Sequence, residues 1–347
     1  MPAWGSDTFR ARWRRRPLPA APFFHRDPLG LTRDPPHGAV PGPAPPGGGP
    51  APGTGSGLEP LHEEAAGDMD GPGPALANAA RFGHLLDALR RRRPLVHHMT
   101  SMVVAHVTAN VTLALGASPI MAAAAEEVEE VAAQADALVL NLGTLTPAAA
   151  DTMVAAGRAA NAAGRPVILD PVGYGFTGLR TRTAQRILSQ VQVAVIRGNQ
   201  AEIALLAGTG GRVRGVDAAG SLEDAAVEDA ARRLAERTGA VAAVTGPVDR
   251  VAGPQGIIRI HHGHPLMAAV TGTGCMATTA VAAFTACAPD RPWEAAAAGL
   301  GAFALAGERA AGGPGGAGPG SFQAALLDAL YRLEPGDLDS LRVEVVS

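Results

Sequence analysis

Apolar positions follow two different spacings along the chain from about residue 75 onward. Short runs rich in Val, Ile and Leu alternate with longer stretches in which apolar residues recur at helical spacing. The short runs predict buried strands, and the longer stretches predict helices. The expected strands lie at residues 95–100, 118–121, 137–143, 166–173, 193–199 and 240–246, with one or two more between 250 and 264. The expected helices lie at residues 75–90, 102–115, 123–135, 146–163, 181–191, 227–238, 276–286, 293–311 and 322–333, with a further helix starting at Glu202.

Strands that alternate with helices predict an α/β protein. Such units form right-handed crossovers, so the strands should make a mainly parallel sheet with helices on both faces. Pro119 in the second expected strand suits the edge of that sheet, because proline has no N–H to donate to a neighbouring strand. We therefore expect a three-layer α/β/α architecture.

Polar residues stand at the C-terminal ends of several expected strands. They are Asn141, Asp170, Arg197, Asn199 and Thr245. The carboxyl ends of parallel strands meet at one edge of the sheet, which is where ligands of open α/β sheets bind. The pattern predicts a ligand site at this edge.

A glycine-rich loop with the sequence V-T-G-T-G-C occupies residues 270–275, directly before the apolar run 276–286. A helix that starts here presents free N–H groups at its positive end, which favours an anion. The same field should stabilise the thiolate of Cys275 and lower its pKa. We expect a phosphate cradle that includes Gly272 and Gly274 and carries a reactive group.

Asp170 and Glu202 are two carboxylates expected at the same sheet edge, close to Asn199. Oxygen ligands of this kind suit Mg²⁺, and Arg197 offers a planar fork for phosphate. These are the parts of a phosphoryl-transfer site. Two plainer interpretations remain open: Asp170 forms the turn of D-P-V-G, and Glu202 starts a helix.

Four further polar residues have two interpretations each. His97 and His98 are either base candidates or core residues of an apolar strand, and the core interpretation is favoured. Thr108 and Asn110 lie inside an apolar helix. They are either core residues with satisfied polar groups or part of a wall of the substrate pocket, and the sequence favours neither interpretation.

Composition changes sharply at about residue 75. Residues 1–74 are rich in Pro, Gly and Arg and show no periodicity, which predicts a disordered extension before one domain at 75–347. The early arginines give a weak similarity to a transit peptide, although an upstream tail or a true start near Met69 is the simpler interpretation.

The charge balance and the cysteines exclude several classes of protein. The formal net charge is −3. The sequence contains no lysine, so arginine supplies all of the positive charge counted in that balance. This balance argues against nucleic acid or a membrane as a partner, and the lack of lysine excludes a P-loop. Cys275 and Cys287 are the two cysteines, without a C-x-x-C spacing, and they suit a reducing, cytoplasmic setting. No apolar stretch suggests a membrane span.

A series of motifs in unbroken order resembles the hydroxyethylthiazole kinase family. The motifs are P-L-V-H (94–97), T-A-N (108–110), L-A-L-G-A-S-P-I-M (113–121), N-L-G-T-L (141–145), L-D-P-V-G (169–173), I-R-G-N-x-x-E-I (196–203), V-T-G-x-V-D (244–249), V-T-G-T-G-C (270–275) and G-P-G-S-F (318–322). The similarity covers residues 75–333, and the combination is highly specific.

The resemblance implies a ribokinase-like fold and a homotrimer with active sites at subunit interfaces. It implies phosphorylation of the hydroxyl group of 4-methyl-5-(2-hydroxyethyl)thiazole by ATP and Mg²⁺, in thiamine biosynthesis or salvage. By the same resemblance, each motif residue receives a role. Met121 and Gly272 bind the substrate, Arg197, Thr245, Asn199 and Gly274 bind ATP, Asp170 and Glu202 organise the metal, and Cys275 stands where related kinases carry an aspartate base.

One residue departs from the family pattern. Ser101 follows Thr100 where the family usually has asparagine, so a contact in the substrate pocket is lost or made through water. Three alternatives stay open at this point: a related small-alcohol kinase such as a hydroxymethylpyrimidine kinase, a nucleotide-dependent dehydratase of the same fold, and a catalytically silent nucleotide-binding protein.

Overall fold

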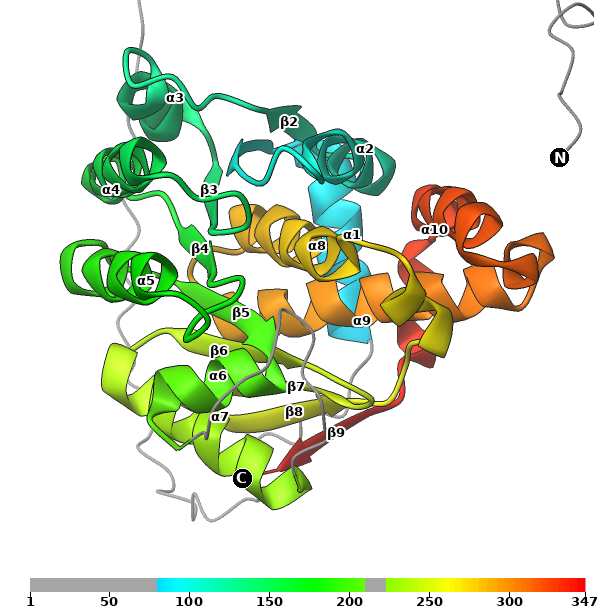
Figure 1. Cartoon of the computed structure of the whole chain (residues 1–347). Coiled ribbons are helices and arrows are strands. Elements are labelled where there is room, and N and C mark those ends of the chain that lie inside the picture. The colour runs from blue at the N-terminus through cyan, green and yellow to red at the C-terminus, as the bar shows by residue number, and fades with distance from the viewer. Residues whose placement is uncertain (1–79, 210–222, 347) are drawn as a thin grey trace, which may run out of the picture. The chain divides into compact units, whose positions relative to one another are not determined.

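The computed structural model describes residues 80–209 and 223–346 (Figure 1). The chain divides into two units, Met1–Asp68 and Met69–Ser347, and the described residues all belong to the second. The extension expected to be disordered, residues 1–74, lies outside the described residues. The boundary expected near residue 75 therefore stays a prediction.

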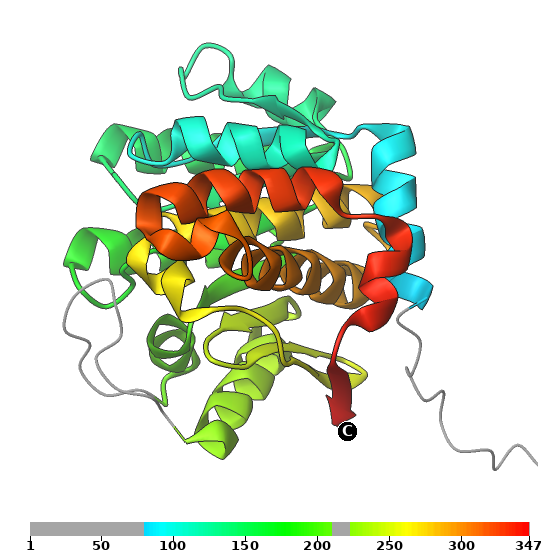
Figure 2. The ribbon, with the colours of Figure 1, turned by 90° about the vertical axis from the view of Figure 1, so that its right-hand side faces the viewer.

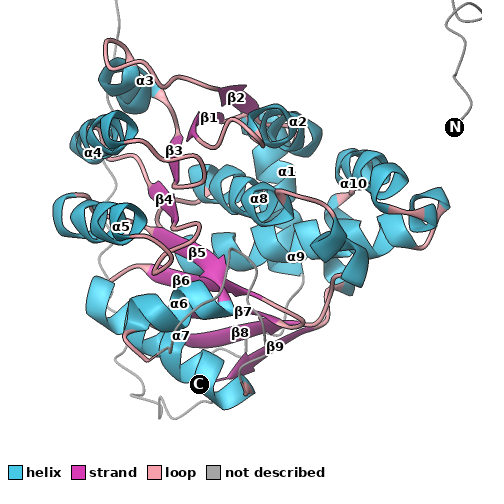
Figure 3. Ribbon diagram, in the orientation of Figure 1, coloured by secondary structure: helices cyan, strands magenta, loops and turns pink. Residues whose placement is uncertain are grey.

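In the described part of the chain, nine strands form one sheet in the order β2-β1-β3-β4-β5-β6-β7-β8-β9 (Figure 3). Neighbours from β2 to β6 pair in parallel, and the pairs from β6 to β9 are antiparallel. The mainly parallel sheet is confirmed, with Pro119 in the edge strand β2. The strands are β1 (Leu95–Met99), β2 (Ser118–Ile120), β3 (Ala137–Asn141), β4 (Val167–Asp170), β5 (Val195–Asn199), β6 (Val241–Thr245), β7 (Asp249–Gly253), β8 (Gly256–Ile260) and β9 (Val343–Val346).

Helices cover both faces of this sheet. The helices are α1 (Ala80–Arg92), α2 (Ala105–Leu115), α3 (Val128–Gln134), α4 (Pro147–Ala162), α5 (Gly178–Gln190), α6 (Gln200–Ala207), α7 (Asp224–Thr238), α8 (Thr273–Cys287), α9 (Pro292–Ala311) and α10 (Pro319–Arg332), with 3-10 turns η1 (Pro265–Ala269), η2 (Pro314–Ala317) and η3 (Pro335–Ser340).

Two separate hydrophobic cores, one between the sheet and each helix layer, show that the fold has three layers. One core joins α1, α2, α8, α9 and α10 to the sheet, and the other joins α3 to α7 to it. Successive side chains of one strand divide between the two cores, as the alternation of a strand requires. Val139 belongs to the first core, and its neighbours Leu138 and Leu140 belong to the second. The expected α/β/α class is confirmed.

The alanine-rich helices α8 and α9 approach each other closely. A Cβ atom at Gly299 would come within 2.8 Å of the backbone of Val281, so only glycine fits there. On the outer side of this layer, α10 lies beside α2 (Figure 2). The close packing holds α8 against the sheet, where its first turn reaches the carboxyl ends of the strands.

Several boundaries differ from the expected ones. α3 starts at Val128 and not at residue 123, because residues 123–127 are exposed and have no apolar face to pack. α8 starts at Thr273, three residues before the expected run. The strand β9 was not expected, since V-E-V-V is too short to show alternation, and it forms by pairing with β8.

Candidate active site

The polar residues expected at one sheet edge do lie there. Asn141 ends β3 and is paired in register with Asp170, which ends β4. Asn199 ends β5 and is paired in register with Thr245, which ends β6, while Arg197 lies two residues before Asn199. The prediction that these residues share an edge is confirmed.

Asp170 is the most deeply buried acid of the site, with no exposed surface. Its Oδ2 accepts hydrogen bonds from Asn141 Nδ2 at 2.7 Å and from Thr278 Oγ1 at 2.8 Å. Its Oδ1 is buried and has no hydrogen-bond partner among the described residues. Burial raises the pKa of this carboxyl, against the opposing effect of the Arg197 guanidinium. Oδ2 of Asp170 is thus fixed by two hydrogen bonds, and Oδ1 is available to bind a ligand.

Arg197 is also buried and lies between Asp170 and β6. Its Nη2 donates a hydrogen bond to Thr245 Oγ1, and its Nη1 is 3.9 Å from Asp170 Oδ1. Its Nε has no hydrogen-bond partner within the described chain. A buried guanidinium that keeps a free donor is suited to an anionic ligand.

The first turn of α8 faces this guanidinium. Gly272 caps the helix with a φ of 82°, and a side chain there would also clash with Val104. A Cβ atom at Gly274 would come 2.7 Å from Arg197 Nη1. Because the first N–H groups of a helix have no partner inside it and Gly272 has no side chain to cap them, the amides of α8 and the Arg197 guanidinium point to one anion site.

Glu202 is held by backbone N–H groups. Its Oε1 accepts from Gly173 N at 2.8 Å, and its Oε2 accepts from Asn199 N at 2.9 Å. Asn199 Oδ1 in turn accepts from Glu202 N, which completes a capping box at the start of α6. Burial and the nearby Asp170 raise the pKa of Glu202 to about 7. The helix-start interpretation of Glu202 is confirmed, and its role toward a metal stays a prediction.

Cys275 lies beside the two buried acids, and the expectation of a lowered pKa is wrong. Its Sγ accepts a hydrogen bond from Asn141 Nδ2 at 3.2 Å. Burial and, after it, the charge of Asp170 raise the pKa of the thiol to about 12. Loss of water and a neighbouring carboxylate outweigh the field of the helix end, so Cys275 is a neutral thiol.

Three further candidates lie in β1 or directly after the neighbouring strand β2. Met121 follows the edge strand β2 and is 39% exposed. His97 and His98 are buried, and their Nε2 atoms contact Ala122 O at 2.8 Å and Thr112 Oγ1 at 3.0 Å. Burial lowers the pKa of both rings, that of His98 to about 3. They are neutral core residues, as favoured from the sequence.

One of the two candidate polar residues inside α2 fits the core interpretation. Thr108 is buried, and its hydroxyl donates to the carbonyl of Val104. Asn110 is only partly buried and lies within hydrogen-bond distance of the exposed His106. Thr108 is therefore satisfied inside its own helix.

Two contributors to the site were missed from the sequence. Thr278 holds Asp170, and its position three residues after Cys275, on the same face of α8, was the available signal. Asn141 was noted at its strand end but given no role, although its amide joins Asp170 to Cys275. Ser101 borders the same cluster, because a Cβ atom at Gly143 would come 2.5 Å from Ser101 Cβ and 2.9 Å from Asn141 Oδ1.

Two features are absent from residues 80–209 and 223–346. No group of three His, Cys, Asp or Glu side chains is arranged to hold a metal ion by itself. No helix in these ranges has the length and apolar character needed to cross a membrane.

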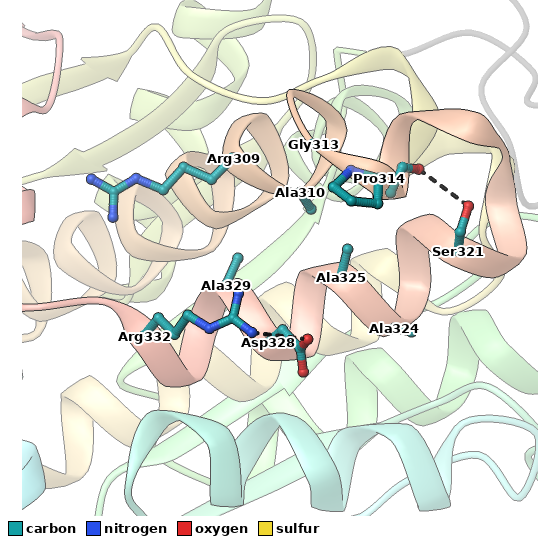
Figure 4. Close-up of a pocket in the computed structure, with 11 residues that line it drawn as sticks. Arg309, Ala310, Gly313, Pro314, Ser321, Ala324, Ala325, Asp328, Ala329 and Arg332 are labelled. Carbon is teal, nitrogen blue, oxygen red and sulfur yellow. Dashed lines mark hydrogen bonds and ion pairs between the residues drawn. The ribbon is translucent and has the colours of Figure 1, made fainter.

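A cavity of about 600 Å³ lies elsewhere, between α9, η2 and α10 (Figure 4). Its two arginines are already paired: Arg309 binds Asp337 at 2.7 Å, and Arg332 lies 3.3 Å from Asp328. None of the strand-end residues lines it. We assign no ligand to this cavity.

Comparison with known proteins found close relatives. The model of the hydroxyethylthiazole kinase family matches residues 86–336. A hydroxyethylthiazole kinase of Thermoanaerobacter sp. (strain X514) is 48% identical over 251 residues, which are 72% of this chain and 94% of the relative. One of Desulfosudis oleivorans is 53% identical over 262 residues, 74% of this chain and 94% of the relative. The solved structure of a hydroxyethylthiazole kinase protein from Pyrococcus horikoshii OT3 has a TM-score of 0.70 and 39% identity, and the match covers 77% of this chain and 99% of that one.

Proposed function

Because the chain belongs to the hydroxyethylthiazole kinase family, we propose that it transfers the γ-phosphoryl group of ATP to the hydroxyl group of 4-methyl-5-(2-hydroxyethyl)thiazole. The product, a thiazole phosphate, would enter thiamine biosynthesis or salvage. We place this activity in residues 75–347, which include the matched residues 86–336.

One observation carries the proposal: the Arg197 guanidinium packs against Gly274 at the start of α8. A buried cation with a free Nε and a set of helix N–H groups meet at one point. Phosphoryl transfer depends chiefly on positioning and on stabilising negative charge, and this point supplies both. In this proposal ATP binds through Arg197, Thr245, Asn199 and Gly274.

The acids of the site fit a magnesium ion that accompanies ATP. Asp170 Oδ1 is a buried carboxylate oxygen with no partner in the described residues, which is a suitable ligand for a hard cation. Both oxygens of Glu202 already accept backbone N–H groups, so Glu202 would add charge near the cation, directly or through water. When bound, Mg²⁺ neutralises charge on the phosphate oxygens.

Cys275 then acts by position and not as a strong base. A thiol with a pKa of about 12 is protonated at neutral pH. Phosphoryl transfer tolerates a weak base, because in a loose transition state the bond to the attacking oxygen is little formed and its proton is not yet strongly acidic. We propose that Cys275 lies next to the substrate hydroxyl, with Gly272 and Met121 as further substrate contacts.

Exposed apolar side chains near the site support a homotrimer whose active sites lie between subunits. Met102 is 87% exposed, Val103 is 68% exposed, and both precede Val104, which contacts Gly272. These two side chains leave apolar surface uncovered beside the site, and Met121 adds exposed apolar surface directly after β2. A second copy of the chain would bury it and complete the pocket. A cytoplasmic location stays a prediction from the cysteine content.

A comparison of substrates tests the proposal. The purified chain with ATP and Mg²⁺ should convert the thiazole alcohol to a monophosphate, detected by mass, much faster than the hydroxymethylpyrimidine alcohol. Preference for the pyrimidine would identify the related kinase. Binding of ATP without phosphate transfer to either alcohol would contradict the proposal and favour a dehydratase or a silent binding protein.

A further inference from the structure

Arg180 ties together two loops at the edge of the sheet. It lies in the first turn of α5 and is partly buried. Its Nη1 donates hydrogen bonds to the carbonyl oxygens of Leu142 at 2.7 Å and Val172 at 2.5 Å, and its Nη2 donates to that of Gly143. Leu142 and Gly143 follow β3, and Val172 follows β4. One guanidinium therefore joins the chain after β3 to the chain after β4.

The same two segments surround Asp170. The carbonyl oxygen of Asp170 accepts hydrogen bonds from Leu142 N at 3.0 Å and from Val172 N at 2.9 Å. Arg180 binds the carbonyl oxygens of these same two residues. Leu142 and Val172 are thus each held twice. The N–H group of each donates to the carbonyl oxygen of Asp170, and the carbonyl oxygen of each accepts from Arg180.

Each loop also orients a side chain of the site. Gly143 N donates to Asn141 Oδ1 at 2.9 Å, which leaves the Asn141 amide nitrogen facing Asp170 and Cys275. Gly173 N, directly after Val172, donates to Glu202 Oε1 at 2.8 Å. A shift of either loop would therefore move Asn141 or Glu202 relative to Asp170.

We propose that Arg180 is a positioning residue for phosphoryl transfer, acting by fixing the loops 142–143 and 172–173 around Asp170. The proposal rests on the proposed function, because it assigns Arg180 to that reaction. A guanidinium suits this task, since its rigid fork directs several N–H groups at once, whereas lysine presents a flexible point charge. Small displacements of reacting groups cost large factors in rate.

The test compares Arg180→Met and Arg180→Lys with a matched control, Arg186→Met. Arg186 lies in the same helix and pairs with the exposed Asp151. Two quantities are measured on the full chain: the steady-state constants with ATP and the thiazole alcohol, and hydrogen–deuterium exchange of the amides of Leu142, Gly143, Val172 and Gly173.

Both Arg180 variants should exchange these amides faster and lose roughly 10- to 100-fold in kcat. KM for either substrate should change by less than about threefold, because neither substrate contacts Arg180 in this account. Arg186→Met should leave the exchange and kcat at wild-type values.

Unchanged exchange in Arg180→Met would overturn the proposal whatever the activity, and faster exchange with an unchanged kcat would overturn the catalytic role. Full activity of Arg180→Lys would show that charge alone matters, against the positioning claim. A wild-type protein that transfers no phosphate would contradict the proposed function, and the exchange comparison would still decide whether Arg180 holds the loops.

Discussion

The main feature of this site is a group of charged side chains buried in the protein interior. Asp170 and Arg197 are buried at the ends of adjacent strands, and Glu202 lies beside them. Their clustering followed from the sequence, because the carboxyl ends of parallel strands meet at one edge. The protonation of Cys275 did not follow, since the sequence does not show that Asn141 brings the thiol and Asp170 together.

Single substitutions should distinguish the contribution of the buried charges to catalysis from the contribution of the Cys275 thiol. Cys275→Ala should lower kcat only modestly, because a neutral thiol contributes little as a base. Asp170→Asn or Arg197→Ala should lower kcat/KM by roughly 100-fold or more, because the first removes the carboxylate proposed to hold the magnesium ion and the second removes the cation proposed to face the phosphate. Steady-state kinetics check this. A loss of activity in Cys275→Ala as complete as in Asp170→Asn would mean that the thiol takes part in covalent chemistry.

His98 should make the fold sensitive to acid. Its pKa is lowered to about 3 by burial, so the folded protein keeps the ring neutral while the unfolded chain protonates it below about 6.5. The stability that His98 contributes is therefore full above pH 6.5 and decreases as the pH falls toward 3. At pH 5 the decrease is about 2 kcal/mol.

Urea unfolding of wild type and His98→Gln at pH 8 and pH 5 measures this effect. Glutamine can still donate to Thr112 Oγ1, which accepts from His98 because its own proton goes to the carbonyl of Thr108. The pH dependence should be smaller in His98→Gln than in wild type. The exposed His106→Gln serves as control, and an equal slope in wild type and His98→Gln would contradict the account.

At the scale of elements, the start of α8 decides how the site is built. The glycine-rich loop predicted a helix end that binds anions, and the structure adds that Gly274 makes room for Arg197. The exact start of the helix was not predictable, because Thr273 and Gly274 carry no apolar pattern. Thr278 and Arg180 were missed for a related reason. Their contacts join elements far apart in the sequence, which spacing along the chain does not reveal.

A pair of glycine substitutions tests the role of this helix start. Gly274 and Gly320 are each the second residue of a helix, α8 and α10. A Cβ atom at Gly274 would press on Arg197, whereas one at Gly320 would meet nothing within 4 Å. Gly274→Ala should raise the KM for ATP roughly 10-fold or more by displacing the guanidinium. Gly320→Ala should leave all constants unchanged. Equal behaviour of the two variants would contradict the assignment of Arg197 to ATP.

At the scale of the whole molecule, the alternation of strands and helices in the sequence predicts only part of the architecture. The three layers and the parallel strands were predictable from periodicity. The position of β1 between β2 and β3 was not, and neither was the antiparallel edge that ends in β9, because both depend on which segments pair in space.

The exposed apolar residues beside the site predict the assembly. Wild-type protein should sediment as a trimer, and Met102→Asp should dissociate it and remove activity together, because a buried charge is unfavourable in an apolar interface. Val345→Asp is the control, since Val345 is exposed on β9, at the opposite edge of the sheet from β2. An active monomer of either wild type or Met102→Asp would contradict an active site shared between subunits.

The central claim is that the buried charges at the strand ends drive transfer of phosphate to the thiazole alcohol. The most direct measurement follows the label from γ-³²P ATP into 4-methyl-5-(2-hydroxyethyl)thiazole phosphate, with wild type and Asp170→Asn side by side. Wild type should label the alcohol stoichiometrically with ADP formation, and Asp170→Asn should label it at least roughly 100-fold more slowly. Release of labelled inorganic phosphate without labelled thiazole, or equal rates for the two proteins, would contradict this account.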